Sequence, residues 1–285
     1  MALKLLQRKN KQMQAEMTFI DHLEELRWHI IRAVISILIG AVVIFIYRDW
    51  VFDNIVAGPI NPDFISYRAF CNFSHWAGLG DALCMPPVQV QMQTTTFGGQ
   101  FVSSITIAMF GGFILAFPYV FWEIWKFIKP ALKPSELSHT RFIIFWVSFF
   151  FFLGVSFGFF VLGPFTFNFL SNFTIGVKEM LETRPTLNDY LDNLLNIIIG
   201  CGIAFELPVL AFAFTKIGLI TPNFLRTSRK YAIVVILIVA AIITPSPDWI
   251  SQMLVFIPLF SLYEISIIIA TRVHKKDMKE QEEWS

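Results

Sequence analysis

The sequence predicts an all-α polytopic membrane protein, and three observations support this prediction. Hydrophobic residues make up 55% of the 285 residues and charged residues 15%, and the mean hydropathy is +0.62. A soluble domain of this length could not bury so much apolar surface. The apolar residues gather in six continuous stretches, which are typical of membrane helices and not of alternating barrel strands. The basic residues concentrate in every second gap between these stretches.

The six stretches differ in length. They run from Trp28 to Tyr47, Phe101 to Phe121, Phe142 to Leu162, Leu194 to Phe214, Tyr231 to Thr244 and Ile250 to Ala270. A bilayer core of about 30 Å needs about 20 apolar residues of helix, which four stretches supply comfortably. The fifth would give only about 21 Å of helix, so we expect a locally thinned bilayer or water beside it. The sixth contains Pro258 and Glu264.

The distribution of Lys and Arg orients the chain. Four of these residues lie in the gaps on one side, namely Arg48, Arg68, Lys178 and Arg184, whereas nearly all others lie on the opposite side. The positive-inside rule then places both termini in the cytoplasm, which agrees with six spans. The first stretch has full span length and no small-residue cleavage site after it, so it is interpreted as an uncleaved span.

We expect one six-span membrane domain, residues 18–270, between a mobile basic cytoplasmic N-terminus (1–17) and a cytoplasmic tail (271–285). The expected external loops are 48–96, 164–192 and 245–249, and the expected cytoplasmic loops are 122–141 and 215–230. The first external loop is long enough to form a small structured cap. The third is so short that the fifth and sixth stretches must form a tight hairpin.

Cysteines and glycines leave two questions open. Cys71 and Cys84 share the first external loop, where an oxidising compartment permits a disulfide, but two free thiols are the alternative. Gly154 and Gly158 form a G-x-x-x-G pattern in the third stretch. The pattern favours close helix packing within the bundle over a dimer interface.

Acidic residues in or beside the spans are the sharpest functional signal. Glu206 lies near the middle of the fourth span, where a charged side chain costs about 2.5–3.5 kcal/mol. It is therefore protonated, paired or facing a wet cavity, and Pro208 bends the helix beside it. Glu264 is a second acid within a span, for which a structural hydrogen bond or an acid that snorkels to the interface is the alternative to a binding role. For Glu206, the alternative to a functional role is a neutral side chain that is hydrogen-bonded inside the bundle and serves only the structure.

Two further acids lie at the cytoplasmic edge. Glu25 falls on a predicted amphipathic helix that starts with a capping box at Thr18, lies along the interface and runs into the first span. Glu136 precedes the third span, where a helix N-terminus favours an acid. Taken alone, Glu25 is best interpreted as part of a solvated face. Zinc, hydrolase and phosphate-loop motifs are missing from the sequence, so we expect no enzyme, no metal and no cofactor.

Five short motifs, in order, resemble those of the TatC family, which supplies the core subunit of the twin-arginine protein translocase. They are Phe19–Arg27 (F-x-x-H-L-x-E-L-R), Phe127–Leu132 followed by Glu136, Phe205–Pro208, Thr244–Pro245 followed by Asp248, Ser251 and Gln252, and Leu262–Ile265. The resemblance covers essentially Phe19 to Ala270. The turn Thr244–Asp248 is one residue longer than the family's usual T-P-P-D, and the first external loop is unusually long.

The resemblance implies a receptor in the cell inner membrane, built as a concave, glove-like bundle of six transmembrane helices. Glu25 and Glu136 would bind the two arginines of a twin-arginine signal peptide on a folded precursor, at a site that Phe127, Pro130, Leu23 and Arg27 help to form. The membrane-embedded residues Glu206, Pro208, Glu264 and Gln252 would dock partners, and Pro245 and Asp248 would form the external turn.

The resemblance also implies the partners. TatA- and TatB-type single-span proteins would assemble with this chain in a multimeric receptor complex in the lipid bilayer and complete transport with the proton-motive force, without nucleic acid. The alternative is an ion- or proton-coupled transporter of small solutes with Glu206 as the coupling site. Such a transporter would more often show internal repeats, and the sequence shows none.

Overall fold

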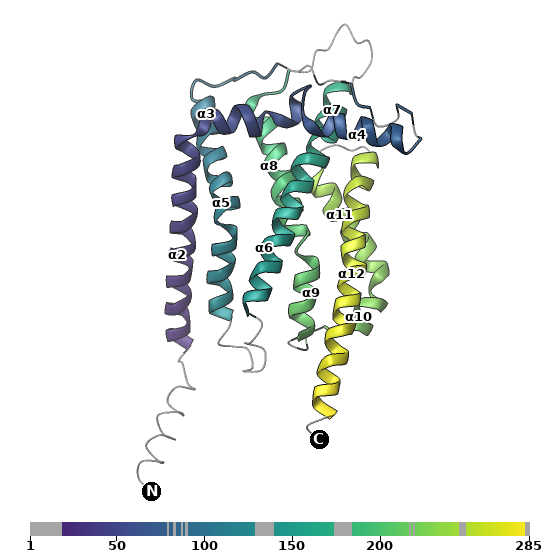
Figure 1. Ribbon diagram of the computed structural model, residues 1–285. Coiled ribbons are helices and arrows are strands. Elements are labelled where there is room, and N and C mark those ends of the chain that lie inside the picture. The colour runs from purple at the N-terminus through teal and green to yellow at the C-terminus, as the bar shows by residue number, and fades with distance from the viewer. Residues whose placement is uncertain are drawn as a thin grey trace.

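Figure 1 shows the computed structural model of the protein. It describes residues 19–282 apart from 79, 82–83, 87, 89–90, 129–139, 174–183, 217, 219 and 245–248. Within these residues the regular elements are all helices, and the only strand-like pairing is an isolated bridge between Gln93 and Thr186. The fold is therefore all-α, as the sequence predicts.

The chain forms long helices joined by short ones. In order they are α2 (Phe19–Ile46), α3 (Arg48–Val51), the π-helical turn η1 (Phe52–Val56), the 3₁₀ turn η2 (Gly58–Ile60), α4 (Ile65–Trp76), α5 (Gly99–Ile128), α6 (Thr140–Phe157), the π-helical turn η5 (Gly158–Leu162), α7 (Gly163–Asn172), α8 (Leu187–Ala204), α9 (Leu207–Lys216), α10 (Pro222–Thr227), α11 (Arg229–Ile243) and α12 (Trp249–Glu282).

The long helices stand side by side in one bundle (Figure 1). The start of α2 and the end of α12 lie at the same end of the bundle, which we call the terminal end. Helices α3, α4 and α7 lie at the opposite end, which we call the cap end. The long helices therefore pack side by side, and short helices cover one end of the bundle.

Five helical segments in the described part of the chain are long and apolar enough to cross a membrane. They are Leu23–Ile46, Gly99–Ile128, Ile143–Asn172, Leu187–Lys216 and Ser251–Lys275. The fifth predicted span forms α11, whose 15 residues give about 22 Å of helix, less than the bilayer core. Apolar side chains of α2 such as Val34, Leu38 and Ile39 are exposed, as expected of a surface in contact with lipid. The chain is a multi-pass membrane protein.

The helices extend beyond the predicted stretches. Residues 19–27, which we expected to lie along the interface, are the first turns of the continuous helix α2. The third span continues through η5 into α7, so helix extends to Asn172 within the expected loop 164–192. The fourth begins at Leu187 and is interrupted at Phe205 and Glu206 before α9. Thr18, on which the predicted capping box rests, lies outside the described residues.

Glycines allow close helix contacts within the chain. A Cβ placed on Gly154 of α6 would lie 2.5 Å from the carbonyl oxygen of Cys201 on α8, and one on Gly158 would lie 3.0 Å from the carbonyl oxygen of Ile197. A Cβ on Gly112 of α5 would similarly meet the α2 backbone. The G-x-x-x-G pattern therefore packs α6 and η5 against α8, as the sequence favours.

Hydrogen bonds and a disulfide stabilise the cap end. Tyr190 Oη donates to the Val56 carbonyl (2.5 Å) and Tyr67 Oη donates to the Pro59 carbonyl (2.6 Å). Burial raises the pKa of Tyr67 to about 12, because desolvation disfavours the phenolate. Of the two alternatives for the external cysteines, the structure has the Cys71–Cys84 disulfide.

Candidate functional site

The predicted signal-peptide site falls at the terminal end of the neighbouring helices α2 and α5. Leu23, Glu25 and Arg27 lie in the first turns of α2, and Phe127 lies in the last turn of α5. Glu25 and Phe127 are half-buried, whereas Leu23 and Arg27 are exposed. Pro130 and Glu136 lie outside the described residues. The structure therefore brings together the α2 and α5 parts of the predicted site.

A buried carboxylate, Glu123, lies between these two helices and is only 1% exposed. Its Oε2 is 2.6 Å from Nδ1 of His29 on α2, and its Oε1 accepts a hydrogen bond from Nζ of Lys126 at 3.1 Å. Nη1 of Arg32 is 3.8 Å from Oε2. Lys126 Nζ also lies 3.5 Å from the ring centroid of Trp122. We call Glu123, His29, Arg32 and Lys126 the Glu123 cluster.

The Glu123 cluster fixes the positions of two predicted site residues. His29 follows Glu25 by four residues on α2, and Phe127 follows Glu123 by four residues on α5, so each pair shares one helix face. The rings of His29 and Phe127 also meet edge-on, with centroids 6.5 Å apart. Because a buried carboxylate is stable only when it is paired, the cluster holds α2 against α5 next to Glu25 and Phe127.

Sequence reasoning missed Glu123. Glu123 and Lys126 both fall in the expected loop 122–141, although α5 continues to Ile128. One signal was available: Arg32 lies within an apolar stretch, and a charge there requires a partner. Glu123 and Lys126, three residues apart in the sequence Trp122-Glu123-Ile124-Trp125-Lys126, form an acid–base pair on one helix face. These observations together would have identified the contact.

Glu206 lies at the break between α8 and α9. The residue is 9% exposed, and its Oε1 has no hydrogen-bond partner among the described residues. The Glu206 carbonyl accepts from the N–H groups of Val209 and Leu210, both at 3.0 Å, and Pro208 is buried beside it. A buried polar atom without a partner costs about 1–3 kcal/mol. The Oε1 atom therefore lacks the hydrogen bond that a buried polar atom normally makes.

The other two predicted embedded residues have partners within the chain. Arg229 on α11 donates to Glu264 on α12 at 2.7 Å, and Gln252 on α12 donates to the Leu237 carbonyl on α11 at 3.2 Å. Both contacts therefore join α11 to α12. Pro245 and Asp248 of the connecting turn lie outside the described residues.

An apolar groove of about 460 Å³ lies toward the cap end of the bundle. Its walls come from α2 (Ile44), α5 (Ile107, Gly111, Ile114, Leu115), α6 and η5 (Val155, Ser156, Phe159, Phe160) and α8 (Leu191, Leu194, Leu195, Ile198). Asn54 and Ser156 are its polar lining residues. The groove has the size and polarity to accept apolar side chains of another segment. Glu206 does not line it.

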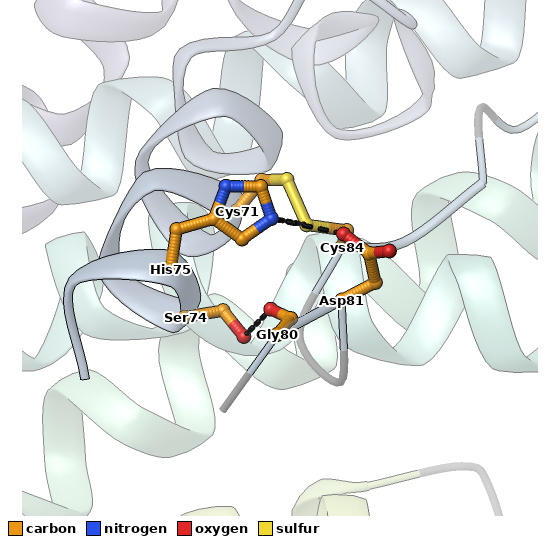
Figure 2. Close-up of a disulfide and its surroundings, with 6 residues drawn as sticks. All are labelled: Cys71, Ser74, His75, Gly80, Asp81 and Cys84. Atoms are coloured by element: carbon orange, nitrogen blue, oxygen red, sulfur yellow. Dashed lines mark hydrogen bonds and ion pairs between the residues drawn. A yellow bond between two sulfur atoms is a disulfide. The ribbon is translucent and has the colours of Figure 1, made fainter. Parts of the chain in front are cut away.

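Potential metal ligands gather at one place in the described chain. Cys71, His75 and Cys84 have their ligand atoms within 4.8 Å of one another. Cys71 and His75 lie on α4 and Cys84 in the segment after it (Figure 2), and α4 lies at the cap end (Figure 1).

Comparison with known proteins gives a consistent result. Residues 21–258 match the family described as Sec-independent protein translocase protein (TatC). The chain is 38% identical over 262 residues to the TatC protein of Blattabacterium sp. subsp. Periplaneta americana, covering 92% of this chain and 97% of the relative. It is 34% identical over 261 residues to that of Carboxydothermus hydrogenoformans, covering 92% and 96%.

The fold is similar to solved structures as well. A crystal structure of the twin arginine translocase receptor TatC aligns with a TM-score of 0.67 at 32% identity, covering 88% of this chain and 99% of that chain. A second crystal structure of that receptor, in DDM, aligns with a TM-score of 0.68 at 31% identity, covering 87% and 99%.

Proposed function

Because this chain belongs to the TatC family of Sec-independent protein translocase proteins, we propose that it is the receptor and scaffold subunit of a twin-arginine translocase. In this proposal the site at the terminal end of α2 and α5 binds the paired arginines of a signal peptide. The family favours protein translocation over the alternative of a small-solute transporter.

The proposal places the protein in the cell inner membrane with six spans, α11 being the short one, and with both termini in the cytoplasm. Two observations support this orientation. The start of α2 and the end of α12 share one end of the bundle (Figure 1), and most of the 22 Lys and Arg residues lie in the segments assigned to that side. The cap end, with its disulfide, would then face the oxidising compartment, where disulfides persist.

The arrangement around Glu25 carries the proposal for the signal peptide. A carboxylate can hold a guanidinium through two parallel hydrogen bonds, a geometry that lysine does not reproduce. The Glu123 cluster holds α2 against α5 at His29, whose ring meets that of Phe127 and which lies one helical turn from Glu25. Glu136 follows α5 in the sequence and would supply a second carboxylate for the second arginine. The site would therefore distinguish Arg-Arg from Lys-Lys.

Affinity requires more than these ion pairs. Exposed carboxylate–arginine pairs contribute only about 0.2–1 kcal/mol each, so the apolar part of the signal peptide must also be buried. The apolar groove between α2, α5, α6 and α8 supplies a surface for that segment or for the helix of a single-span TatA- or TatB-type partner. Glu206, buried and without a described hydrogen-bond partner, supplies a polar contact for a partner helix.

Peptide binding to variants of the purified protein tests this function. We expect an Arg-Arg signal peptide to bind in mild detergent at least about tenfold more tightly than its Lys-Lys counterpart, which corresponds to about 1.4 kcal/mol. Glu25→Ala should weaken binding of the Arg-Arg peptide and reduce the ratio of the two affinities. Glu24→Ala is the matched control, because Glu24 is the neighbouring acid on α2 and is exposed. Equal binding of the two peptides, or an equal effect of both variants, would contradict the site.

A further inference from the structure

The segment that follows α4 brings together four side chains that bind transition metals. Cys71 and His75 lie on α4, and Asp81 and Cys84 lie in the segment after it (Figure 2). The ligand atoms of Cys71, His75 and Cys84 lie within 4.8 Å of one another. His75 Nε2 is 2.9 Å from Asp81 Oδ1 and 3.7 Å from Cys84 Sγ. Two sulfurs and one imidazole therefore lie close together, and one carboxylate is hydrogen-bonded to that imidazole.

Elements other than the disulfide fix this convergence. Cys71 and His75 are four residues apart on α4 and so share one face of the helix. The chain then turns through Gly78 and Gly80, whose φ angles of 71° and 59° lie in the left-handed region that favours glycine. Ser74 Oγ donates to the Gly80 carbonyl at 2.6 Å and holds the turn against α4. Asp81 follows directly, so helix and turn position three of the four side chains.

His75 and Asp81 have no role in a simple disulfide, which needs only the two cysteines. Figure 2 shows the imidazole directed toward both the disulfide and Asp81. The same ring nitrogen, Nε2, is the atom nearest to Asp81 Oδ1 and to Cys84 Sγ. The 2.9 Å contact between His75 Nε2 and Asp81 Oδ1 is an exposed hydrogen-bonded pair. One ring nitrogen therefore lies beside both a carboxylate and a sulfur, which are groups that bind zinc.

The distances agree with a tetrahedral zinc site after a small adjustment. Zinc bonds of about 2.3 Å to sulfur, 2.0–2.1 Å to nitrogen and 2.0–2.2 Å to oxygen place the donors about 3.4–3.8 Å apart. The His75 Nε2 to Cys84 Sγ distance of 3.7 Å is already in this range, and the 2.9 Å from His75 Nε2 to Asp81 Oδ1 must lengthen slightly. The two sulfurs reach this separation only as thiolates. The metal and the disulfide are therefore alternatives.

We propose that Cys71, His75, Asp81 and Cys84 bind one zinc ion when the disulfide is reduced. A dithiol reductant transfers two electrons and two protons to the Cys71–Cys84 bond, and its own thiols become a disulfide. Zinc then binds both sulfurs, and the two thiol protons are released to solvent. The side chains of His75 and Asp81 are 57% and 88% exposed, so the ion has direct access. The loop is thus closed in both redox states, by a covalent bond or by a metal.

Titration of the full-length protein in mild detergent with Co²⁺ and then Zn²⁺ tests the proposal. We expect the reduced protein to bind one Co²⁺ per chain, with the visible bands of tetrahedral cobalt and a sulfur-to-cobalt charge-transfer band, and to lose them when Zn²⁺ is added. The oxidised protein should show neither. His75→Ala, which leaves both cysteines in place, should weaken binding by at least the about 10–100-fold that loss of an outer-shell partner costs. Cys201→Ser is the matched control, because Cys201 is the buried cysteine of α8, and should bind as the wild type does.

Three results would overturn the proposal. The first is a reduced wild type without tetrahedral cobalt bands. The second is equal metal binding by the oxidised protein, because the metal would then bind elsewhere. The third is unchanged affinity in His75→Ala, because the two thiols alone would then account for binding. None of these outcomes depends on signal-peptide binding, so the zinc site and the proposed receptor function are tested independently.

Discussion

Replacing Glu123 with alanine tests whether the Glu123 cluster holds α2 against α5. The carboxylate is 1% exposed and contacts His29 on the facing helix at 2.6 Å. The substitution removes this contact and leaves the buried ring of His29 without its partner. It also leaves Lys126 and Arg32 without an acid. The chain should remain inserted, because the apolar faces of its helices are unchanged, but the α2–α5 contact should weaken.

The loss of stability follows from the exposure of each partner. A buried hydrogen bond to a charged group contributes about 1.5–3 kcal/mol, which applies to the contact with His29. The side chains of Lys126 and Arg32 are 36% and 52% exposed, so each of these ion pairs adds less than about 1 kcal/mol. We expect Glu123→Ala to lower the free energy of unfolding by about 2–4 kcal/mol.

The buried thiol of Cys201, which is 1% exposed, allows the assay. With the Cys71–Cys84 disulfide intact, a fluorogenic thiol reagent reports unfolding of the bundle as the protein is heated in mild detergent. The midpoint should fall by several degrees in Glu123→Ala and by less in Glu123→Gln, which keeps a hydrogen-bonding side chain. Glu24→Ala should melt as the wild type does. A wild-type midpoint for Glu123→Ala would refute the structural role of the cluster.

Three further predictions address other parts of the structure. Gly154→Leu should destabilise the bundle by about 1–3 kcal/mol or more, because a side chain there meets the α8 backbone, whereas Gly98→Ala, with open space around it, should be neutral in the same thiol assay. Tyr67→Phe should lower the free energy of unfolding by about 1 kcal/mol. Because burial raises the pKa of Tyr67 to about 12, the stability that the neutral phenol contributes is complete below pH 10 and is lost between pH 10 and 12. The variant, which has no phenol, should therefore lose less stability than the wild type over that range. Glu206→Leu should stabilise the isolated chain by removing an unpartnered buried oxygen but lower the co-purification of single-span partners; unchanged recovery would contradict partner docking at Glu206.

The helical architecture followed from the sequence because lipid leaves few options. Every backbone group in a bilayer must be satisfied within the chain, so continuous apolar stretches such as Phe101–Phe121 specify helices. Their ends were less predictable. The helix α7 and the start of α8 at Leu187 contain polar residues, and burial against the cap end, not hydropathy, makes them helical. Tyr190, for example, is 3% exposed and hydrogen-bonds to the carbonyl of Val56.

The candidate site was predictable only in part, for two physical reasons. Motifs identified residues that present chemistry at a surface, such as Glu25 and Phe127, but not the buried Glu123 that positions them, because its role depends on contacts between helices. The sequence also left the pairing of Cys71 and Cys84 open. The proximity of His75 and Asp81 to their sulfurs depends on a glycine turn, and a search for histidine spacing alone does not detect it.

The most direct test of the proposed receptor is a photo-cross-linking measurement from Leu23, an exposed residue of α2 two positions from Glu25. A photoreactive amino acid at this position is presented to an Arg-Arg signal peptide added to inverted inner-membrane vesicles, and separately to right-side-out vesicles. We expect a cross-link in inverted vesicles that the Lys-Lys peptide forms far less and that Glu25→Ala diminishes. A cross-link only from the opposite membrane face, or equal cross-linking of both peptides, would contradict it.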